Sequence, residues 1–130
     1  MKQIKYIGHL GVAALVGYLA IGGGVLQAHH SFSAQYDSER SETVEGIVTN
    51  VAWRNPHVYF YMDVFDAEGD VTEWSFELSN ISAMRNQGWS RGTVNVGDRL
   101  EVTGFRARDD SHLLNARAVK RLDDGKTLLE

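Results

Sequence analysis

The stretch HVYFYMDVF, residues 57–65, alternates two kinds of side chain along its whole length. Successive residues of an extended chain point to opposite sides, so one side is apolar and carries Val58, Phe60, Met62 and Val64. The other side carries imidazole, phenol and carboxylate groups, from His57, Tyr59, Tyr61 and Asp63. This pattern predicts a β-strand that buries one face and leaves the other for solvent or a ligand.

A second alternating stretch follows after the turn-forming residues 67–70. Within 71–78, one face carries Trp74, Phe76 and Leu78, and the opposite face carries Glu73, Ser75 and Glu77. Because the turn is short, the two stretches are expected to pair antiparallel. We expect Tyr59 and Tyr61 to lie against Glu73 and Ser75, and the two glutamates to form an exposed acidic face.

Weaker strand signals lie on both sides of this hairpin. An earlier strand is predicted over 43–53, with a bulge or bend at Gly46 and an interruption at Asn55-Pro56. A short helix over 81–87 is capped by Ser79 or Asn80 and ended by Gly88. Two further strands are predicted over 99–106, with a second bend at Gly104, and over 113–122, before a frayed tail.

Three strands, one short helix and two strands predict an all-β domain. This order resembles the oligonucleotide/oligosaccharide-binding (OB) fold, a small five-stranded barrel with a helix between its third and fourth strands. A two-sheet sandwich is the open alternative, because the order of elements does not prove that the sheet closes.

The first 28 residues have the features of a secretory signal. Lys2 and Lys5 precede an apolar run over 6–26, and Leu26 and Ala28 suit a cleavage after residue 28. We therefore predict a signal peptide at 1–28, an N-terminal arm at 29–41 and an OB-like domain at 42–130, in the periplasm or secreted. The alternative is an uncleaved anchor, since 6–26 has about the length that spans a bilayer; His9 and the glycines at 22–24 disfavour it.

Charge and composition narrow the expected partners. The whole chain has a net charge of −4, and loss of the two leader lysines leaves 11 basic against 17 acidic residues, a net charge of −6. An acidic surface predicts no nucleic-acid partner and no membrane adhesion after cleavage. The chain contains no cysteine, so no disulfide or thiolate nucleophile is available. No nucleophile elbow or phosphate loop is present, and a non-enzymatic role is expected.

The mature chain also resembles a family of small secreted bacterial proteins known only as a domain of unknown function. The matching motifs are His29-His30-Ser31-Phe32, Gly46-Ile47-Val48, Trp53-Arg54-Asn55-Pro56-His57, Trp74-Ser75-Phe76-Glu77, Gly88-Trp89 and Val96-Gly97-Asp98. The resemblance implies secretion and a single β-rich domain, and it implies no activity.

The polar face of the first alternating stretch is the candidate ligand site, formed by Arg54, His57, Tyr59 and Tyr61. Aromatic rings at this place of an OB-like barrel stack on ligand rings. The glutamates of the neighbouring strand would repel phosphate, which leaves a neutral glycan, a peptide or a cationic ligand. An unknown small ligand or a periplasmic protein is therefore the expected partner. The alternative is that the two tyrosines only support the sheet through cross-strand pairs.

Histidines provide a second candidate site, for a metal ion. The candidate ligands are His29, His30, His57 and His112. After cleavage His29 would offer an α-amine and an imidazole to one ion, and nitrogen ligands suit Cu(II) best and Zn(II) next. This resembles the start of the histidine brace of copper oxygenases and some periplasmic copper carriers. This hypothesis makes copper the expected cofactor. The alternative is a solvated terminus without a cofactor, with His57 hydrogen-bonded near Asn55 or Asp63.

Overall fold

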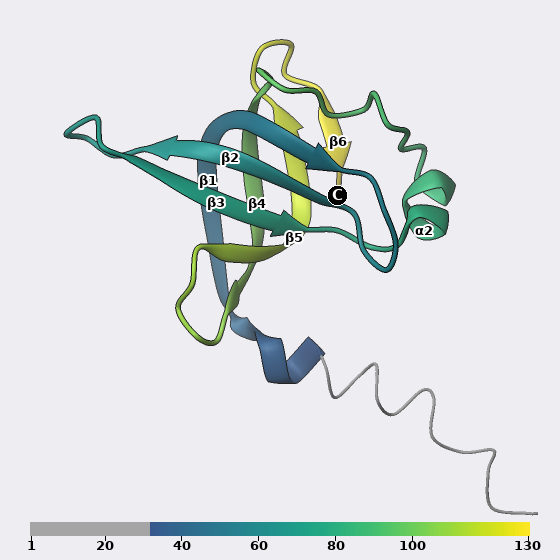
Figure 1. The fold of residues 1–130 in the computed structure, drawn as a ribbon, viewed down its shortest axis with the longest axis horizontal. Helices are drawn as coiled ribbons and strands as arrows, with labels where there is room; N and C mark the ends of the chain where they lie inside the picture. Colours follow the sequence, from purple (N-terminus) through teal and green to yellow (C-terminus); the bar gives the residue numbers. More distant parts are fainter. Residues whose placement is uncertain (1–31) are drawn as a thin grey trace, which may run out of the picture.

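The computed structural model describes residues 32–130, in which six strands and one short helix follow a helical turn at residues 32–35 (Figure 1). The strands are β1 (Tyr36–Ala52), β2 (Tyr59–Phe65), β3 (Val71–Glu77), β4 (Arg99–Ala107), β5 (Leu113–Arg121) and β6 (Thr127–Leu129), and the helix is α2 (Ile81–Asn86). Within these residues, no helix has the length and apolar character needed to cross a bilayer.

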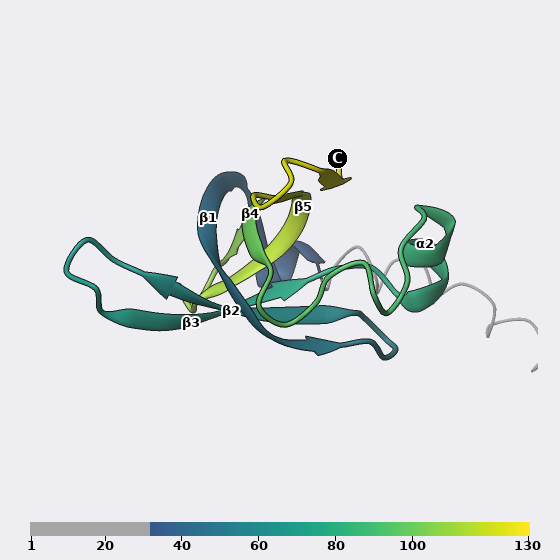
Figure 2. The same ribbon diagram turned by 90° about the horizontal axis from the view of Figure 1, so that it is seen from above.

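The strands form one sheet that closes into a ring. Its order is β3-β2-β1-β4-β5-β6, and a further parallel pairing joins β3 to β5 between residues 75–77 and 113–115. Figures 1 and 2 show β1 curving around the ring so that it pairs with β2 at one end and β4 at the other. The predicted OB-like, all-β fold with one short helix is confirmed, and the open sandwich is excluded by the β3–β5 pairing.

Two elements differ from the sequence prediction. β1 begins at Tyr36, inside the predicted N-terminal arm, because its first residues pair with Arg106 and Ala107 of β4. The tail contains β6, which pairs with β5 through Val119 and Leu129. Both segments lack a local alternation, so their extended conformation depends on a partner strand that is distant in sequence or in space.

Gly104 explains how closely β4 and β5 approach. A Cβ atom at this position would lie 2.4 Å from the carbonyl oxygen of Asn115, so no larger residue fits without a backbone shift. The β4–β5 register shifts between Thr103 and Gly104, as the predicted bend requires. Gly46 approaches β2 in the same way, with a Cβ 2.6 Å from the carbonyl oxygen of Asp63. The irregularities of β1 lie elsewhere, between Asp37 and Ser41 and between Val48 and Asn50.

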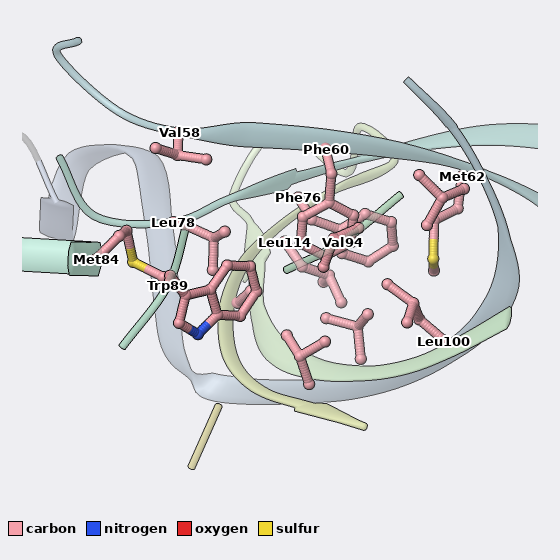
Figure 3. Close-up of a cluster of buried hydrophobic side chains, with 14 of the residues drawn as sticks. Val58, Phe60, Met62, Phe76, Leu78, Met84, Trp89, Val94, Leu100 and Leu114 are labelled. Atoms are coloured by element: carbon pink, nitrogen blue, oxygen red, sulfur yellow. The ribbon is translucent and has the colours of Figure 1, made fainter. Parts of the chain in front are cut away.

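The apolar faces of β2 and β3 point into the ring, as their alternation predicts. Phe60 and Phe76 are fully buried and stack with ring centroids 4.9 Å apart. Figure 3 shows them gathered with Leu114 and Leu100 inside the ring. Met84 of α2 joins this core, which fixes the helix against the end of the ring.

Local signals define the ends of α2 and the loop before β2. The Asn80 side chain accepts a hydrogen bond of 2.9 Å from the Ala83 amide, so Asn80 rather than Ser79 is the N-cap. Gly88 follows the helix with a positive φ of 84°. The Asn55-Pro56 peptide is cis and lies between β1 and β2, where the prediction places an interruption.

Candidate functional site

The outer face of the β2–β3 hairpin carries the candidate ligand residues. The register places Tyr59 opposite Glu77, Tyr61 opposite Ser75, and Asp63 opposite Glu73. Tyr61 therefore lies against Ser75 as predicted, whereas the predicted contact of Tyr59 with Glu73 is wrong. Glu77, the last residue of β3, lies next to the tyrosine that begins β2.

Glu77 is buried, with 5% of its surface exposed. The prediction of an exposed acidic face is therefore wrong for Glu77, whereas Glu73 is exposed. Burial follows from the ring closure, because Glu77 pairs with β5 and Tyr36 covers its carboxylate. A buried carboxylate needs hydrogen-bond donors to offset the loss of water.

Two tyrosines supply those donors, and a histidine lies beside the carboxylate. The Tyr36 hydroxyl donates to Oε2 of Glu77 at 2.8 Å, and the Tyr59 hydroxyl donates to the same oxygen. Nδ1 of His57 lies 3.1 Å from Oε1. We call these four residues, Tyr36, His57, Tyr59 and Glu77, the Glu77 cluster.

The two phenols of the cluster are poor acids. Burial first, and then the hydrogen bond to Glu77, raise the pKa of Tyr36 above its ordinary value. The same two causes, in the same order, raise the pKa of Tyr59. Both hydroxyls therefore keep their protons at neutral pH and donate them to the carboxylate, which locks the Tyr59 ring in place.

Tyr36 reaches the cluster from the first position of β1. It follows a short helical turn over 32–35, and the Phe32 ring packs on it with centroids 5.5 Å apart. No periodic pattern in the sequence around Tyr36 predicts this position. The residues that sequence reasoning missed, Tyr36 and buried Glu77, become a pair only when the ring closes.

His57 lies at the edge of the cluster with about half of its side chain, 46%, exposed. Nδ1 faces Oε1 of Glu77 at 3.1 Å, so Nε2 is the ring nitrogen left outside this contact. Of the partners suggested from sequence, Asn55 instead accepts from the Ile81 amide at 3.2 Å, and Asp63 lies farther along β2. The partner of His57 is therefore Glu77, which the sequence did not suggest.

The remaining candidate residues lie outside the hydrogen bonds of the cluster. Arg54 is exposed in the loop after β1, and Tyr61 is half-buried one cross-strand step from Tyr59. His112 is exposed, and its ring packs on Trp74 with centroids 5.0 Å apart. The structure brings His57 and Tyr59 together on Glu77 and places His112 in a different cluster.

His29 and His30 lie outside the described residues, so the metal set that includes them stays a prediction. Within 32–130, no group of three or more histidine, aspartate or glutamate side chains has the arrangement that holds a metal ion.

Comparison with known proteins identifies a family and a fold. Residues 18–115 match DUF6152, a family of unknown function, in agreement with the resemblance to such a domain. No curated protein matches the chain. Among solved structures, the mitochondrial single-stranded DNA binding protein Rim1 of S. cerevisiae has a similar fold, with 10% sequence identity over 64% of this chain and 93% of that chain, and a TM-score of 0.50. At this identity the likeness shows the fold alone.

The yeast protein corrects one prediction, the exclusion of nucleic acid as a partner. That exclusion used the net charge of the mature chain, and a protein of this fold binds single-stranded DNA. Net charge sums over the whole surface, whereas binding depends on the charge of the face that meets the ligand. Nucleic acid therefore belongs among the probes that any binding test has to include.

Proposed function

The chain belongs to DUF6152, a family of unknown function. From its own residues, we propose that it is an exported, non-enzymatic binding module. Its ligand face is the outer surface of β2 and β3 around His57, Tyr59 and Tyr61. The observation that carries the proposal is the Glu77 cluster, in which a buried carboxylate holds two surface-reaching side chains in one conformation.

Preorganisation of this kind favours binding. A side chain that is already held by hydrogen bonds loses little conformational freedom when a ligand arrives. Tyr59 is held in this way, His57 lies at ion-pair distance from the same carboxylate, and the half-buried Tyr61 extends the aromatic surface by one cross-strand pair. Arg54, exposed before β2, would supply a hydrogen-bonding cation at the border of the face.

The charge of the cluster indicates a neutral ligand. Oε2 of Glu77 already accepts hydrogen bonds from two tyrosine hydroxyls, Oε1 lies 3.1 Å from Nδ1 of His57, and the carboxylate is buried. Tyrosine rings with fixed hydroxyls stack on the apolar face of a sugar and donate or accept at its edge. A short neutral glycan is therefore the ligand class that this face fits best.

The test uses the mature chain, residues 29–130, labelled for NMR. Chitotriose is the neutral probe and a ten-nucleotide oligothymidylate is the anionic one. We expect chitotriose to shift the amide resonances of residues 57–61 and 75–77, and Tyr61→Ala to weaken its binding by about tenfold or more, which is 1.4 kcal/mol. Val96→Ala, which trims an exposed apolar side chain away from the face, is the control and should bind normally.

Two outcomes would overturn this assignment. If neither probe shifts the resonances of the face at saturating concentration, the tyrosines serve as cross-strand support and the ligand face does not exist. If oligothymidylate shifts them and chitotriose does not, the ligand is a nucleic acid and the neutral-ligand assignment is wrong.

A second candidate function is copper handling in the periplasm, and the geometry of His57 favours it. Metal-binding histidines commonly donate a hydrogen bond from their second ring N–H to a carboxylate, which orients the ring and makes the other nitrogen a better ligand. The placement of His57 resembles this arrangement, because Nδ1 lies 3.1 Å from a carboxylate oxygen of Glu77 and Nε2 lies outside this contact. Cleavage after Ala28 would add the amine and imidazole of His29, a nitrogen-rich set that suits Cu(II), with His30 and His112 as further predicted ligands.

Copper binding is tested by Cu(II) titration of two chains, one that begins at His29 and one that carries an extra methionine before it. We expect the first to bind at least about tenfold more tightly, and His57→Ala to remove that advantage. His112→Ala is the comparison variant, because that ring packs on Trp74. Equal affinities of the two chains, or an exported chain that begins elsewhere by mass spectrometry, would reject the copper site and leave the glycan test unaffected.

A further inference from the structure

The β2–β3 hairpin extends beyond the ring of strands (Figures 1 and 2). Pairing of β2 with β1 ends at Ile47 and Asp63, and pairing of β3 with β5 is limited to residues 75–77. The distal half of the hairpin, residues 63–73, is therefore paired only with itself over most of its length. Such an extension buries little of its own surface, so its side chains are free to meet another molecule.

Exposed apolar side chains gather on one face of this extension. Phe65 and Val71 are directly opposite each other and are 52% and 51% exposed. Ile47, at 38%, lies opposite Asp63 on the neighbouring strand. These are three of the four large exposed apolar residues within 32–130. By the alternation of the strands they share the outer side of the sheet, and clustered exposure of this kind is typical of interaction sites.

Carboxylates surround these apolar side chains. Asp63 and Glu73 lie directly opposite each other, and neither makes an ion pair or side-chain hydrogen bond within the described part of the chain. Like charges in this position destabilise a sheet. Residues 63–73 contain five carboxylates and no lysine or arginine. We define the hairpin face as Ile47, Asp63, Phe65, Val71 and Glu73. Arg99 of β4 is directly opposite Ile47 and places a cation at the border of this face.

The same segment of β3 has an open backbone edge. The Ser75 amide donates to the His112 carbonyl at 2.8 Å, so the edge away from β2 carries the polar groups of Ser75. Backbone groups alternate between the two edges of a strand, and those of Glu73 and Val71 therefore point to the same edge as Ser75. No strand of the described chain pairs with them there. An added strand would find hydrogen-bonding partners at both residues.

We propose that the hairpin face and this edge bind an extended, basic segment of a partner protein. The segment adds to β3 as a strand, the mode in which backbone bonds give affinity and alternate side chains give specificity. Its apolar side chains cover Val71 and Phe65, and its lysines or arginines lie beside Asp63 and Glu73, which relieves their mutual repulsion. A second copy of this chain would bring the same uncompensated carboxylates to the edge, so charge favours a basic partner over self-pairing.

The probe is the blocked eight-residue peptide Lys-Thr-Val-Thr-Lys-Thr-Val-Thr, which presents lysine and valine in turn on one face of a strand, compared with the peptide in which glutamate replaces each lysine. We expect the lysine peptide alone to shift the amide resonances of residues 63–73. The double substitution Asp63→Asn with Glu73→Gln should weaken its binding by about tenfold or more. The control is Glu39→Gln with Glu130→Gln, which removes the same two charges at exposed positions outside the hairpin face.

A further variant separates strand addition from general attraction. Glu73→Pro removes one amide donor at the open edge and leaves the bonds to β2 in place, and it should abolish the peptide-induced shifts. The Asp63→Asn/Glu73→Gln pair decides the question if this variant does not fold.

Four outcomes would overturn the proposal. The first two are that both pairs of glutamine or asparagine substitutions weaken binding of the lysine peptide equally, or that the two peptides bind equally well. The others are that oligothymidylate and not the lysine peptide shifts the resonances of residues 63–73, or that sedimentation shows the chain to dimerise through these residues. None of them bears on the His57 and Tyr61 face.

Discussion

The Tyr36 hydroxyl donates a 2.8 Å hydrogen bond to Oε2 of Glu77, which joins the first residue of β1 to the last residue of β3. The two residues are 41 positions apart. Their contact covers the place where β3 meets β5 and supplies the buried carboxylate with a donor. One interaction therefore supports both the closure of the ring and the orientation of the candidate ligand face.

Loss of the Tyr36 hydroxyl should destabilise the fold. Tyr36→Phe leaves the ring in place and removes one of the donors to Glu77, so we expect a loss of about 1–3 kcal/mol in the free energy of unfolding. Chemical denaturation measures it. Tyr61→Phe is the matched control, since the Tyr61 hydroxyl makes no hydrogen bond within residues 32–130. Equal stability of the two variants would show that the Tyr36–Glu77 bond contributes nothing.

Stability should fall in alkaline solution. Folding raises the pKa of Tyr36 and Tyr59, whereas tyrosines of the unfolded chain ionise near pH 10. The stabilisation is complete below about pH 10 and is lost as the pH rises toward the folded pKa values, because only the unfolded state releases these protons. Denaturation midpoints at increasing pH, with tyrosinate absorbance in native and denaturing buffer, measure the effect. Ionisation of every tyrosine of the folded protein near pH 10 would contradict the raised pKa of Tyr36 and Tyr59.

A methyl group at Gly104 should disrupt the β4–β5 pairing. Its Cβ would meet the Asn115 carbonyl oxygen at 2.4 Å, so Gly104→Ala should cost about 1–3 kcal/mol, the usual cost of overpacking. Gly92→Ala is the control, because nothing lies within 4 Å of a Cβ there and no positive φ is required. Thermal unfolding of both variants tests this, and a stable Gly104→Ala protein would contradict the close approach.

Arg106 should not tolerate lysine. Its buried guanidinium donates to Glu42 and to the Asp110 carbonyl, both at 2.8 Å, and lies 4.5 Å from the centre of a Trp74 ring. Lysine cannot make these contacts together, so Arg106→Lys should cost about 1.5–3 kcal/mol and alter tryptophan fluorescence. Arg117→Lys, at an exposed position over Phe105, is the control. Similar unfolding curves for the two variants would argue against a structural role of Arg106.

Strand faces and the helix were predictable because they depend on consecutive residues. The alternation in 57–65 and 71–78 identifies the buried side chains of the hairpin, including Phe60 and Phe76. Asn80 and Gly88 mark the ends of α2 by their own hydrogen-bonding and backbone preferences. β6 was not predictable, since it is extended only where β5 offers an edge to pair with.

The candidate site was predictable only in part. Alternation is enough to place His57, Tyr59 and Tyr61 on one outer face, but it does not determine the register across the turn. The pairing of the folded hairpin makes Glu77, and not the predicted Glu73, the neighbour of Tyr59. The ionic environment of the tyrosine therefore depended on the pairing of the folded hairpin.

The sequence by itself determined which side chains each strand turns inward and outward, because that choice repeats every two residues along the chain. Only the tertiary structure decided that Glu77 is buried and held by Tyr36, Tyr59 and His57. These groups come from three separate segments, and they meet because β1 curves around the ring while β3 closes onto β5. A contact of this kind depends on how distant strands pair, which no local pattern of residues encodes.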